Sequence, residues 1–198
     1  MFIHGLGGDA FNTWCSGTTK TDAWPYWLGA EFPEVGVWSL GYAASWSRWG
    51  RFLGLFSKRR RDTGYSMALP DRALQVLDLM HQHEVGQRPI LFICHSLGGL
   101  LTKQILRASS DAAGNPTDIL ARNTRAVLFL STPHTGAELA TLLDGFRAAF
   151  GTTVSIADLK AHDPHLRNLL NWYRKRSVEL GIRTRTYYEE SAVSRAHC

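Results

Sequence analysis

Short, continuous apolar runs alternate with longer helical patterns along the whole chain. Several of the runs lack the polar alternation of a half-exposed strand, as expected for strands that are buried on both faces. Because parallel strands are joined by crossover connections that are usually helices, this alternation predicts an α/β domain with a mostly parallel sheet flanked by helices. The expected strands are Met1–His4, Val35–Leu40, Pro89–Cys94, Ala126–Ser131 and Thr184–Tyr188.

Helical patterns fill the segments between these runs. Asp163 followed by Pro164 is an N-cap and first-turn signal for one of them, and Gly181 is its C-terminal stop. The expected helices are Asp22–Phe32, Pro70–His83, Leu97–Ser109, Gly136–Phe150 and Asp163–Val178. The first two are expected to bury apolar faces formed by Trp24, Trp27 and Leu28 and by Leu74, Leu77 and Met80.

The composition is that of an ordinary globular domain. A chain of 198 residues, 44% of them hydrophobic, fits one domain, residues 1–198. The net charge of +5 does not by itself indicate nucleic-acid binding. No basic and aromatic RNA-reader motif, zinc-type Cys/His spacing or Walker loop is present. We therefore expect no nucleic-acid partner, no metal and no cofactor.

The three scattered cysteines, Cys15, Cys94 and Cys198, argue against a disulfide framework and fit a reducing compartment. No apolar run is long enough to span a bilayer, and no charged-then-apolar leader precedes the first strand. A cytoplasmic location is the expectation, unless a leader lies upstream of Met1.

The run Ile90–Cys94 leads directly into His95-Ser96-Leu97-Gly98-Gly99, where a helical pattern begins. A serine among small residues at such a strand-to-helix turn is the nucleophile-elbow pattern G-x-S-x-G, here with Cys94 in place of the first glycine. Small neighbours are needed because the turn is tight, and the helix N-terminus adds positive potential where an oxyanion develops. Ser96 is therefore the candidate nucleophile, and the backbone N–H of Leu97 is a candidate oxyanion donor. The alternative is a serine in an ordinary helix-capping turn.

A glycine-rich loop, His4-Gly5-Leu6-Gly7-Gly8, follows the first strand. Glycines after a strand can simply form a flexible turn, but an acyl-transfer site needs two N–H donors. We assign the second donor to the backbone of Leu6. We expect His4, which precedes the serine in the chain, to be a structural hydrogen-bonding residue.

A third motif, Thr132-Pro133-His134-Thr135-Gly136, follows the fourth expected strand. With the other two motifs, in this order, the chain resembles the α/β-hydrolases related to the serine-active-site-containing protein. It resembles more distantly the GPI inositol-deacylases and other lipase-like serine esterases. The resemblance extends from residue 1 to about residue 190 and implies an α/β-hydrolase-type fold with an acyl-ester hydrolase or acyltransferase site, commonly for lipid substrates. It also implies that His134 is structural and that its motif shapes the wall of the site.

The same resemblance implies the chain order serine, acid, histidine. The acid candidate is Glu189, after the last expected strand, where a carboxylate can orient a histidine. Glu190, Asp144 and Asp158 are alternative candidates for the acid. Glu189 could also be an ordinary exposed residue at a strand end, with no catalytic role. His197 is the candidate base, although it follows Glu189 too closely for the further strand that such relatives place between them. We therefore expect a chain truncated at both ends or frameshifted, with residues 191–198 as an atypical tail.

Residues 43–66 are rich in tryptophan, phenylalanine and arginine. Four apolar side chains share a helical face there, and the basic run Lys58-Arg59-Arg60-Arg61 follows them. The simpler interpretation is an amphipathic surface helix with a solvated basic tail. The alternative is a lid or flap that contacts a membrane surface through residues 46–61. The four apolar residues are Trp46, Trp49, Leu53 and Phe56.

Together these residues predict a serine esterase or lipase-like hydrolase whose substrate is a small-molecule ester or lipid. In this prediction Ser96 attacks the ester carbonyl, a histidine accepts its proton and Glu189 orients that histidine, while the Leu6 and Leu97 amides hold the oxyanion. The alternative is a catalytically impaired or inactive hydrolase-fold binding module, or a truncated gene product, because the histidine base is not evident.

Overall fold

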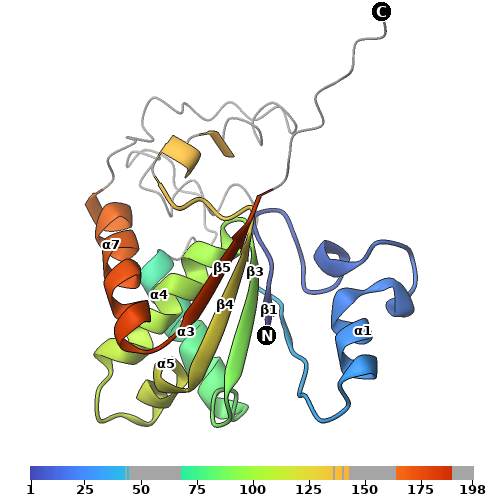
Figure 1. The fold of residues 1–198 in the computed structure, drawn as a ribbon, viewed down its shortest axis with the longest axis horizontal. Coiled ribbons are helices and arrows are strands. Elements are labelled where there is room, and N and C mark those ends of the chain that lie inside the picture. Colours follow the sequence, from blue (N-terminus) through green and yellow to red (C-terminus); the bar gives the residue numbers. More distant parts are fainter. Residues whose placement is uncertain (43, 45–67, 136, 140, 143–163, 189–198) are drawn as a thin grey trace, which may run out of the picture.

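The computed structural model describes residues 1–42, 44, 68–135, 137–139, 141–142 and 164–188. Within these ranges the chain forms a five-stranded sheet in the order β2-β1-β3-β4-β5, and every neighbouring pair is parallel (Figure 1). Helices flank this sheet, so the predicted α/β fold class is confirmed. The strands are β1 Phe2–Ile3, β2 Ser39–Leu40, β3 Ile90–His95, β4 Thr124–Leu130 and β5 Arg183–Tyr187.

Helices α3, α4 and α7 lie on one face of the sheet, and α1 lies on the other side (Figure 1). The helix expected over Gly136–Phe150 and the cap expected at Asp163 fall largely outside the described residues. Gly181 adopts a φ of +67° just after α7, as its predicted role as a helix stop requires. The helices are α1 Trp24–Glu31, α3 Leu69–Gln82, α4 Gly98–Asp111, α5 Ile119–Asn123 and α7 Pro164–Glu179.

The main core lies between the sheet and helices α3, α4 and α7. Its centre is formed by β3 and β4, whose registered pairs include Phe92 with Val127 and Cys94 with Phe129, all four fully buried. The unbroken apolar run of β3 reflects this position, because a central strand of a covered parallel sheet has few solvent-facing positions. The helices add the fully buried residues Ala73, Leu101, Ile105 and Leu106.

Some of the apolar side chains that were expected to face the core are exposed in the structure. Trp24 and Trp27 are 44% and 46% exposed, and no residue of α1 is buried. In α3, Leu74 is 51% exposed, because the helix turns a neighbouring face to the core. The spacing identified residues that share a face, but it could not show whether another element packs against that face. The second strand is also shorter than expected and begins at Ser39. The residues that α3 buries are Ala73, Val76, Leu77 and Met80.

The strand order creates a topological switch point between β1 and β3. From β1 the chain moves to β2 on one side, and it then crosses back to β3 on the other side. In open α/β sheets the loops at such a point diverge, and ligands bind in the crevice outside the carboxyl ends of the strands. These ends carry the loop that begins at His4 and the turn at Ser96, so the topology brings the first two motifs together. Other α/β folds share this order, so it defines a place for chemistry but no particular reaction.

Of the three cysteines, Cys15 and Cys94 are free thiols in the structure, and Cys198 lies outside the described residues. In the part of the chain that the structure describes, no helix has the length and apolar character needed to cross a bilayer.

Gly98→Ala is expected to lower the free energy of unfolding by about 1–3 kcal/mol, because the added methyl group overpacks a tight contact. A Cβ at Gly98 would lie 2.3 Å from the carbonyl oxygen of His4 and 2.5 Å from that of Ile3, and backbone atoms cannot swing away as a flexible side chain can. Urea denaturation measures the change.

The matched control is Gly29→Ala in α1, where the new Cβ would lie 3.8 Å from the Val37 side chain, an ordinary contact. This substitution should raise the free energy of unfolding by up to about 1 kcal/mol through helix propensity. Equal effects of the two substitutions would show that the approach of α4 to β1 is not tight.

Candidate functional site

Ser96 lies at the bend between β3 and α4 in a left-handed backbone conformation. Its φ is +52°, and the residue is buried, with only 1% of its surface exposed. This conformation costs an L-residue about 1–2 kcal/mol, so the surroundings must hold it. The Ser96 N–H donates to the carbonyl oxygen of Leu130 at 2.8 Å, and the Ser96 carbonyl accepts from Thr132 Oγ1 at 2.9 Å. The last residue of β4 and a residue just after it therefore clamp the two peptide groups on either side of the Ser96 Cα.

The Ser96 hydroxyl is buried without a hydrogen-bond partner among the described residues. A helix-capping serine would instead accept a hydrogen bond from an amide in the first turn of α4. The N-cap of α4 is Leu97, and no side chain caps this helix end. Ser96 is thus not the helix-capping serine that was the alternative interpretation of the sequence. It lies at a strained strand-to-helix bend.

The loop after β1 passes directly over this bend. A Cβ at Gly5 would lie 2.7 Å from Ser96 Cβ and 3.2 Å from Ser96 Oγ, so only glycine fits. Next along the loop, Gly7 has a φ of +68° and donates from its amide to the carbonyl oxygen of Ala44 at 2.8 Å. Gly5 is therefore needed for the close approach of the loop to Ser96, and Gly7 is needed for the turn.

The two predicted oxyanion donors are chain neighbours of the two residues in close contact at this bend, since Leu6 follows Gly5 and Leu97 follows Ser96. Leu6 and Leu97 are turn residues, and neither amide donates a hydrogen bond within the described ranges. Their side chains are buried in one apolar cluster together with Leu100, which fixes the two turns relative to each other. Helix α4 begins at Gly98, so its positive end also lies at Ser96. This is the electrostatic setting that a developing oxyanion needs.

Cys94 occupies the place of the first glycine in the elbow pattern and is fully buried. Its Sγ lies 3.0 Å from Thr102 Oγ1, and the Thr102 hydroxyl donates to the carbonyl oxygen of Gly98 at 2.9 Å. Burial raises the pKa of this thiol to about 12. Cys94 is therefore a neutral packing residue at neutral pH and not a competing nucleophile.

The third motif supports the elbow from the side. Besides its bond to Ser96, Thr132 packs so closely on α4 that a Cβ at Gly99 would lie 2.3 Å from Thr132 Oγ1. His134 points elsewhere: its Nδ1 lies 3.2 Å from Lys103 Nζ, and its Nε2 lies 3.4 Å from Thr186 Oγ1. These contacts agree with the structural role that the resemblance implied for His134. Sequence reasoning missed Lys103, since a lysine in a helical pattern normally indicates a solvated position.

His4 is fully buried, and its imidazole stacks on Tyr42 with ring centroids 4.3 Å apart. Its Nδ1 lies 2.9 Å from the carbonyl oxygen of Gly5, and the Tyr42 hydroxyl donates to the His4 carbonyl at 2.6 Å. Burial lowers the pKa of His4, so the ring is neutral and Nδ1–H is the donor to Gly5. These bonds hold the loop after β1 and agree with the structural role expected for His4.

No imidazole of the described residues forms a hydrogen bond with Ser96 Oγ. The predicted acid Glu189, its alternatives and the predicted base His197 all lie outside the described residues, as do residues 45–66 of the possible lid and the tail 191–198. In the same described ranges, no group of three histidine, cysteine or acidic side chains is arranged to hold a metal ion.

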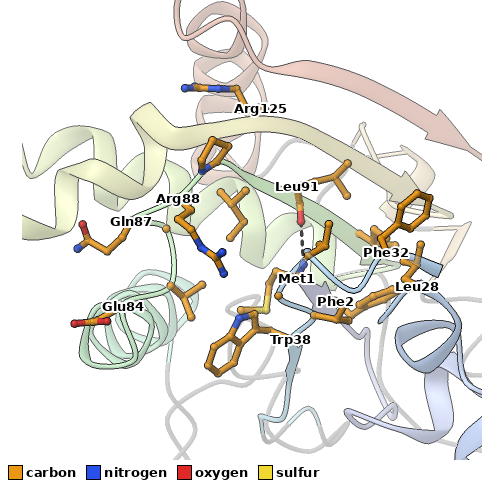
Figure 2. Close-up of a pocket in the computed structure, with 18 of the residues that line it drawn as sticks. Met1, Phe2, Leu28, Phe32, Trp38, Glu84, Gln87, Arg88, Leu91 and Arg125 are labelled. Atoms are coloured by element: carbon orange, nitrogen blue, oxygen red, sulfur yellow. Dashed lines mark hydrogen bonds between the residues drawn. The ribbon is translucent and has the colours of Figure 1, made fainter. Parts of the chain in front are cut away.

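A cavity of about 830 Å³ lies at the opposite, amino-terminal end of the strands. Figure 2 shows Met1 and Leu91 at its centre, joined by the 2.9 Å bond from the Met1 amino group to the Leu91 carbonyl oxygen. Apolar side chains such as Trp38 and Phe32 line it together with Arg88. Because switch-point chemistry occurs at the carboxyl ends, this cavity is separate from the site at Ser96.

The chain has curated relatives across most of its length. It is 31% identical over 185 residues to the protein SERAC1 of Danio rerio, a match that covers 85% of this chain and 27% of that protein. It is 30% identical over 184 residues to the SERAC1 proteins of Mus musculus and Homo sapiens, with 85% of this chain and 26% of each relative covered. No family model and no solved structure matches significantly.

These matches confirm that the chain has homologues named SERAC1, which is the relationship that the three motifs indicated. The chain spans about a quarter of the length of the curated relatives it matches.

Ser96→Ala is expected to raise the free energy of unfolding by about 1 kcal/mol, because it removes a buried hydroxyl that has no partner. Ser96→Gly should add about 1 kcal/mol to that gain, because glycine adopts a positive φ without steric cost. Chemical denaturation of the three proteins separates the two effects. A glycine variant less stable than the alanine variant would contradict the left-handed conformation at this position.

Lowering the pH from about 6.5 toward 4 is expected to destabilise the protein through His134. Burial, together with the neighbouring Lys103, lowers the pKa of His134 from 6.5 to about 4 in the folded state. In this window the unfolded chain takes up a proton that the folded protein does not, so stability is full above pH 6.5 and falls by up to about 1.4 kcal/mol per pH unit below it.

The measurement is the free energy of unfolding across this pH range for wild type and for His134→Gln, which does not titrate. The variant should lose less stability per pH unit, with His4 supplying a residual slope because its pKa is lowered as well. Identical slopes would exclude His134 as the source.

Proposed function

We propose that this chain is a serine hydrolase of the α/β-hydrolase type that acts on carboxylic esters. The observation that carries the proposal is the conformation of Ser96. It is a buried serine with a φ of +52° at the switch point of a parallel sheet, and the nearby residues Leu6 and Leu97 have amides that donate to no group in the described ranges. A strained residue that the surrounding structure holds at a binding crevice is a mark of a functional site.

In the proposed reaction, Ser96 Oγ forms a bond to the ester carbonyl carbon, and the carbonyl oxygen becomes an oxyanion. The amides of Leu6 and Leu97 donate hydrogen bonds to that oxygen, a contribution of roughly 10²–10³-fold in rate for each such donor. A histidine takes the Ser96 proton and gives it to the leaving alkoxide when the ester C–O bond breaks. Water then attacks the acyl-enzyme in the same manner and releases the carboxylic acid.

We propose His197 as this histidine and Glu189 as the carboxylate that orients it. Both assignments rest on the chain order of nucleophile, acid and base that the sequence resemblance implies. Glu189 comes two positions after the last residue of β5 in the sequence. In open α/β sheets the chemistry takes place outside the carboxyl ends of the strands, which supports a search for the acid among the residues that follow β5 in the chain.

The proposed substrate is an ester with an apolar acyl chain. The support is the apolar cluster around the two oxyanion donors, in which Leu6, Leu97 and Leu100 are buried together with Leu139 and Leu166. An alkyl chain that enters beside the donors would meet apolar rather than charged surface.

A second candidate function is that of a non-catalytic module that retains the hydrolase fold. The observation that favours it is the Ser96 hydroxyl without an imidazole partner among the described residues. Removal of a triad member typically leaves only the residual catalysis of the oxyanion hole and of binding, on the order of 10³–10⁴-fold over water.

A fluorophosphonate probe distinguishes the two functions, since its phosphorus atom is attacked by an activated serine and remains bound to it. We expect the full chain to be labelled at Ser96 and Ser96→Ala to remain unlabelled, measured by intact mass and peptide mapping. The matched control is Ser110→Ala on the far end of α4, where Arg176 Nε donates to Ser110 Oγ at 3.1 Å; this variant should be labelled like wild type.

Absence of labelling in protein whose folding is verified by its denaturation curve would leave the non-catalytic module as the function. Labelling that persists in Ser96→Ala would place the nucleophile at another serine.

A further inference from the structure

Lys103 is a buried cation with an unusual environment. It lies on α4, seven residues after Ser96, and is 1% exposed. Its Nζ lies 4.8 Å from the ring centroid of Phe129 and 5.6 Å from that of Tyr173. Within the described ranges it forms no ion pair with a carboxylate. A buried ammonium without a partner of opposite charge is costly, so its hydrogen bond is the feature to explain.

That hydrogen bond connects Lys103 to His134. Lys103 Nζ lies 3.2 Å from His134 Nδ1, and an ammonium group only donates, so Nδ1 must accept. The ring proton is then on Nε2, which lies 3.4 Å from Thr186 Oγ1 at the end of β5. The backbone N–H of His134 donates to the carboxylate of Glu138, which holds the residue from a third direction. The imidazole is thereby fixed in orientation and in tautomer.

His134 lies two residues after Thr132, the residue that clamps the Ser96 carbonyl. Thr132, whose hydroxyl donates to the Ser96 carbonyl at 2.9 Å, is separated from His134 only by Pro133, whose φ is restricted by its ring. Thr132 also packs against Gly99 of α4. Lys103 and Gly99 lie one helical turn apart on α4, so the helix contacts the segment Thr132–His134 at both of its ends.

We propose that Lys103 is a positioning residue for Ser96: its ammonium group holds His134 in the Nε2–H tautomer and so fixes the segment Thr132–His134 that clamps the elbow. The part of this inference that concerns the rate of attack by Ser96 rests on the proposed hydrolase function. The part that concerns the tautomer of His134 does not.

The groups that face Lys103 come from several elements. They are the Cys94 thiol of β3, the His134 ring and the Glu138 carboxylate from the segment after β4, and the Tyr173 ring of α7, whose hydroxyl lies 2.9 Å from Thr184 Oγ1. Burial lowers the pKa of Lys103 to about 8, with Cys94 and Glu138 acting in the opposite direction. Lys103 is thus an ammonium group at neutral pH. Above about pH 8 it loses a proton and can accept a hydrogen bond, so His134 Nδ1 no longer has to be the acceptor.

Long-range ¹H–¹⁵N correlation spectra of the full ¹⁵N-labelled chain report which ring nitrogen carries the proton. Signals of His134 are identified by their loss in His134→Gln. At pH 7 wild type is expected to show the Nε2–H tautomer, and Lys103→Met to show a mixture or the Nδ1–H tautomer. The matched control Lys175→Met, an exposed lysine of α7, should leave the spectrum unchanged.

The second readout is the rate of fluorophosphonate labelling at Ser96. We expect Lys103→Met to lower it by about tenfold or more through misplacement of the nucleophile, with the KM for an ester substrate little changed, and Lys175→Met to keep the wild-type rate. If Lys103→Met keeps the wild-type tautomer, or changes the tautomer but labels at the wild-type rate, the proposal is overturned.

Two further outcomes are also decisive. If wild type is not labelled at all, the hydrolase function fails, while the spectra still decide whether Lys103 sets the tautomer. If Lys103→Met does not fold, a titration of wild type decides: the Nε2–H signal of His134 should give way as the pH passes about 8. A tautomer unchanged up to about pH 10 would overturn the proposal.

Discussion

The backbone of Ser96 is held by one hydrogen bond to the last residue of β4 and one to the segment that follows it, and the site is built around them. Its N–H donates to Leu130, and its carbonyl accepts from Thr132. A left-handed serine is otherwise unfavourable by about 1–2 kcal/mol, which is comparable to what two such hydrogen bonds contribute. The unfavourable conformation of Ser96 is therefore offset by hydrogen bonds to β4 and the segment after it, and not by interactions within the elbow. For this reason the segment after β4 belongs to the site although none of its described residues forms a hydrogen bond with Ser96 Oγ.

The opposite wall of the site depends on close approach of backbone to backbone. The loop after β1 lies so near the elbow that a Cβ at Gly5 or at Gly98 would meet atoms at 2.7 Å or closer. Leu6 and Leu97 directly follow Gly5 and Ser96 in the chain, their amides donate no hydrogen bond within the described ranges, and their side chains pack in a common apolar cluster. Main-chain donors held in this way need no rearrangement when charge develops, which is the physical basis of oxyanion stabilisation.

The same region concentrates features that are unfavourable for stability. Ser96 Oγ, His4 Nε2 and Trp14 Nε1 are the buried side-chain polar atoms that lack partners among the described residues, and the first two belong to the elbow and to the loop beside it. Lys103 adds a buried cation whose contacts are an imidazole and two aromatic rings. Proteins tolerate such departures chiefly where function requires them, so their clustering at one end of the sheet supports the functional assignment independently of sequence motifs.

The sequence by itself determined the α/β class, the positions of the five strands to within a few residues and the bend at Ser96. These are local properties: apolar runs of strand length, helical spacing, and small residues where a chain must turn sharply. Only the tertiary structure decided that Trp24 and Trp27 remain exposed and that Lys103 is buried against His134. The strand order and the clamp from Thr132 to Ser96 were also decided there. The reason is that burial and hydrogen bonding between residues far apart in the chain depend on which elements pack together, and the spacing of residues within one element does not contain that information.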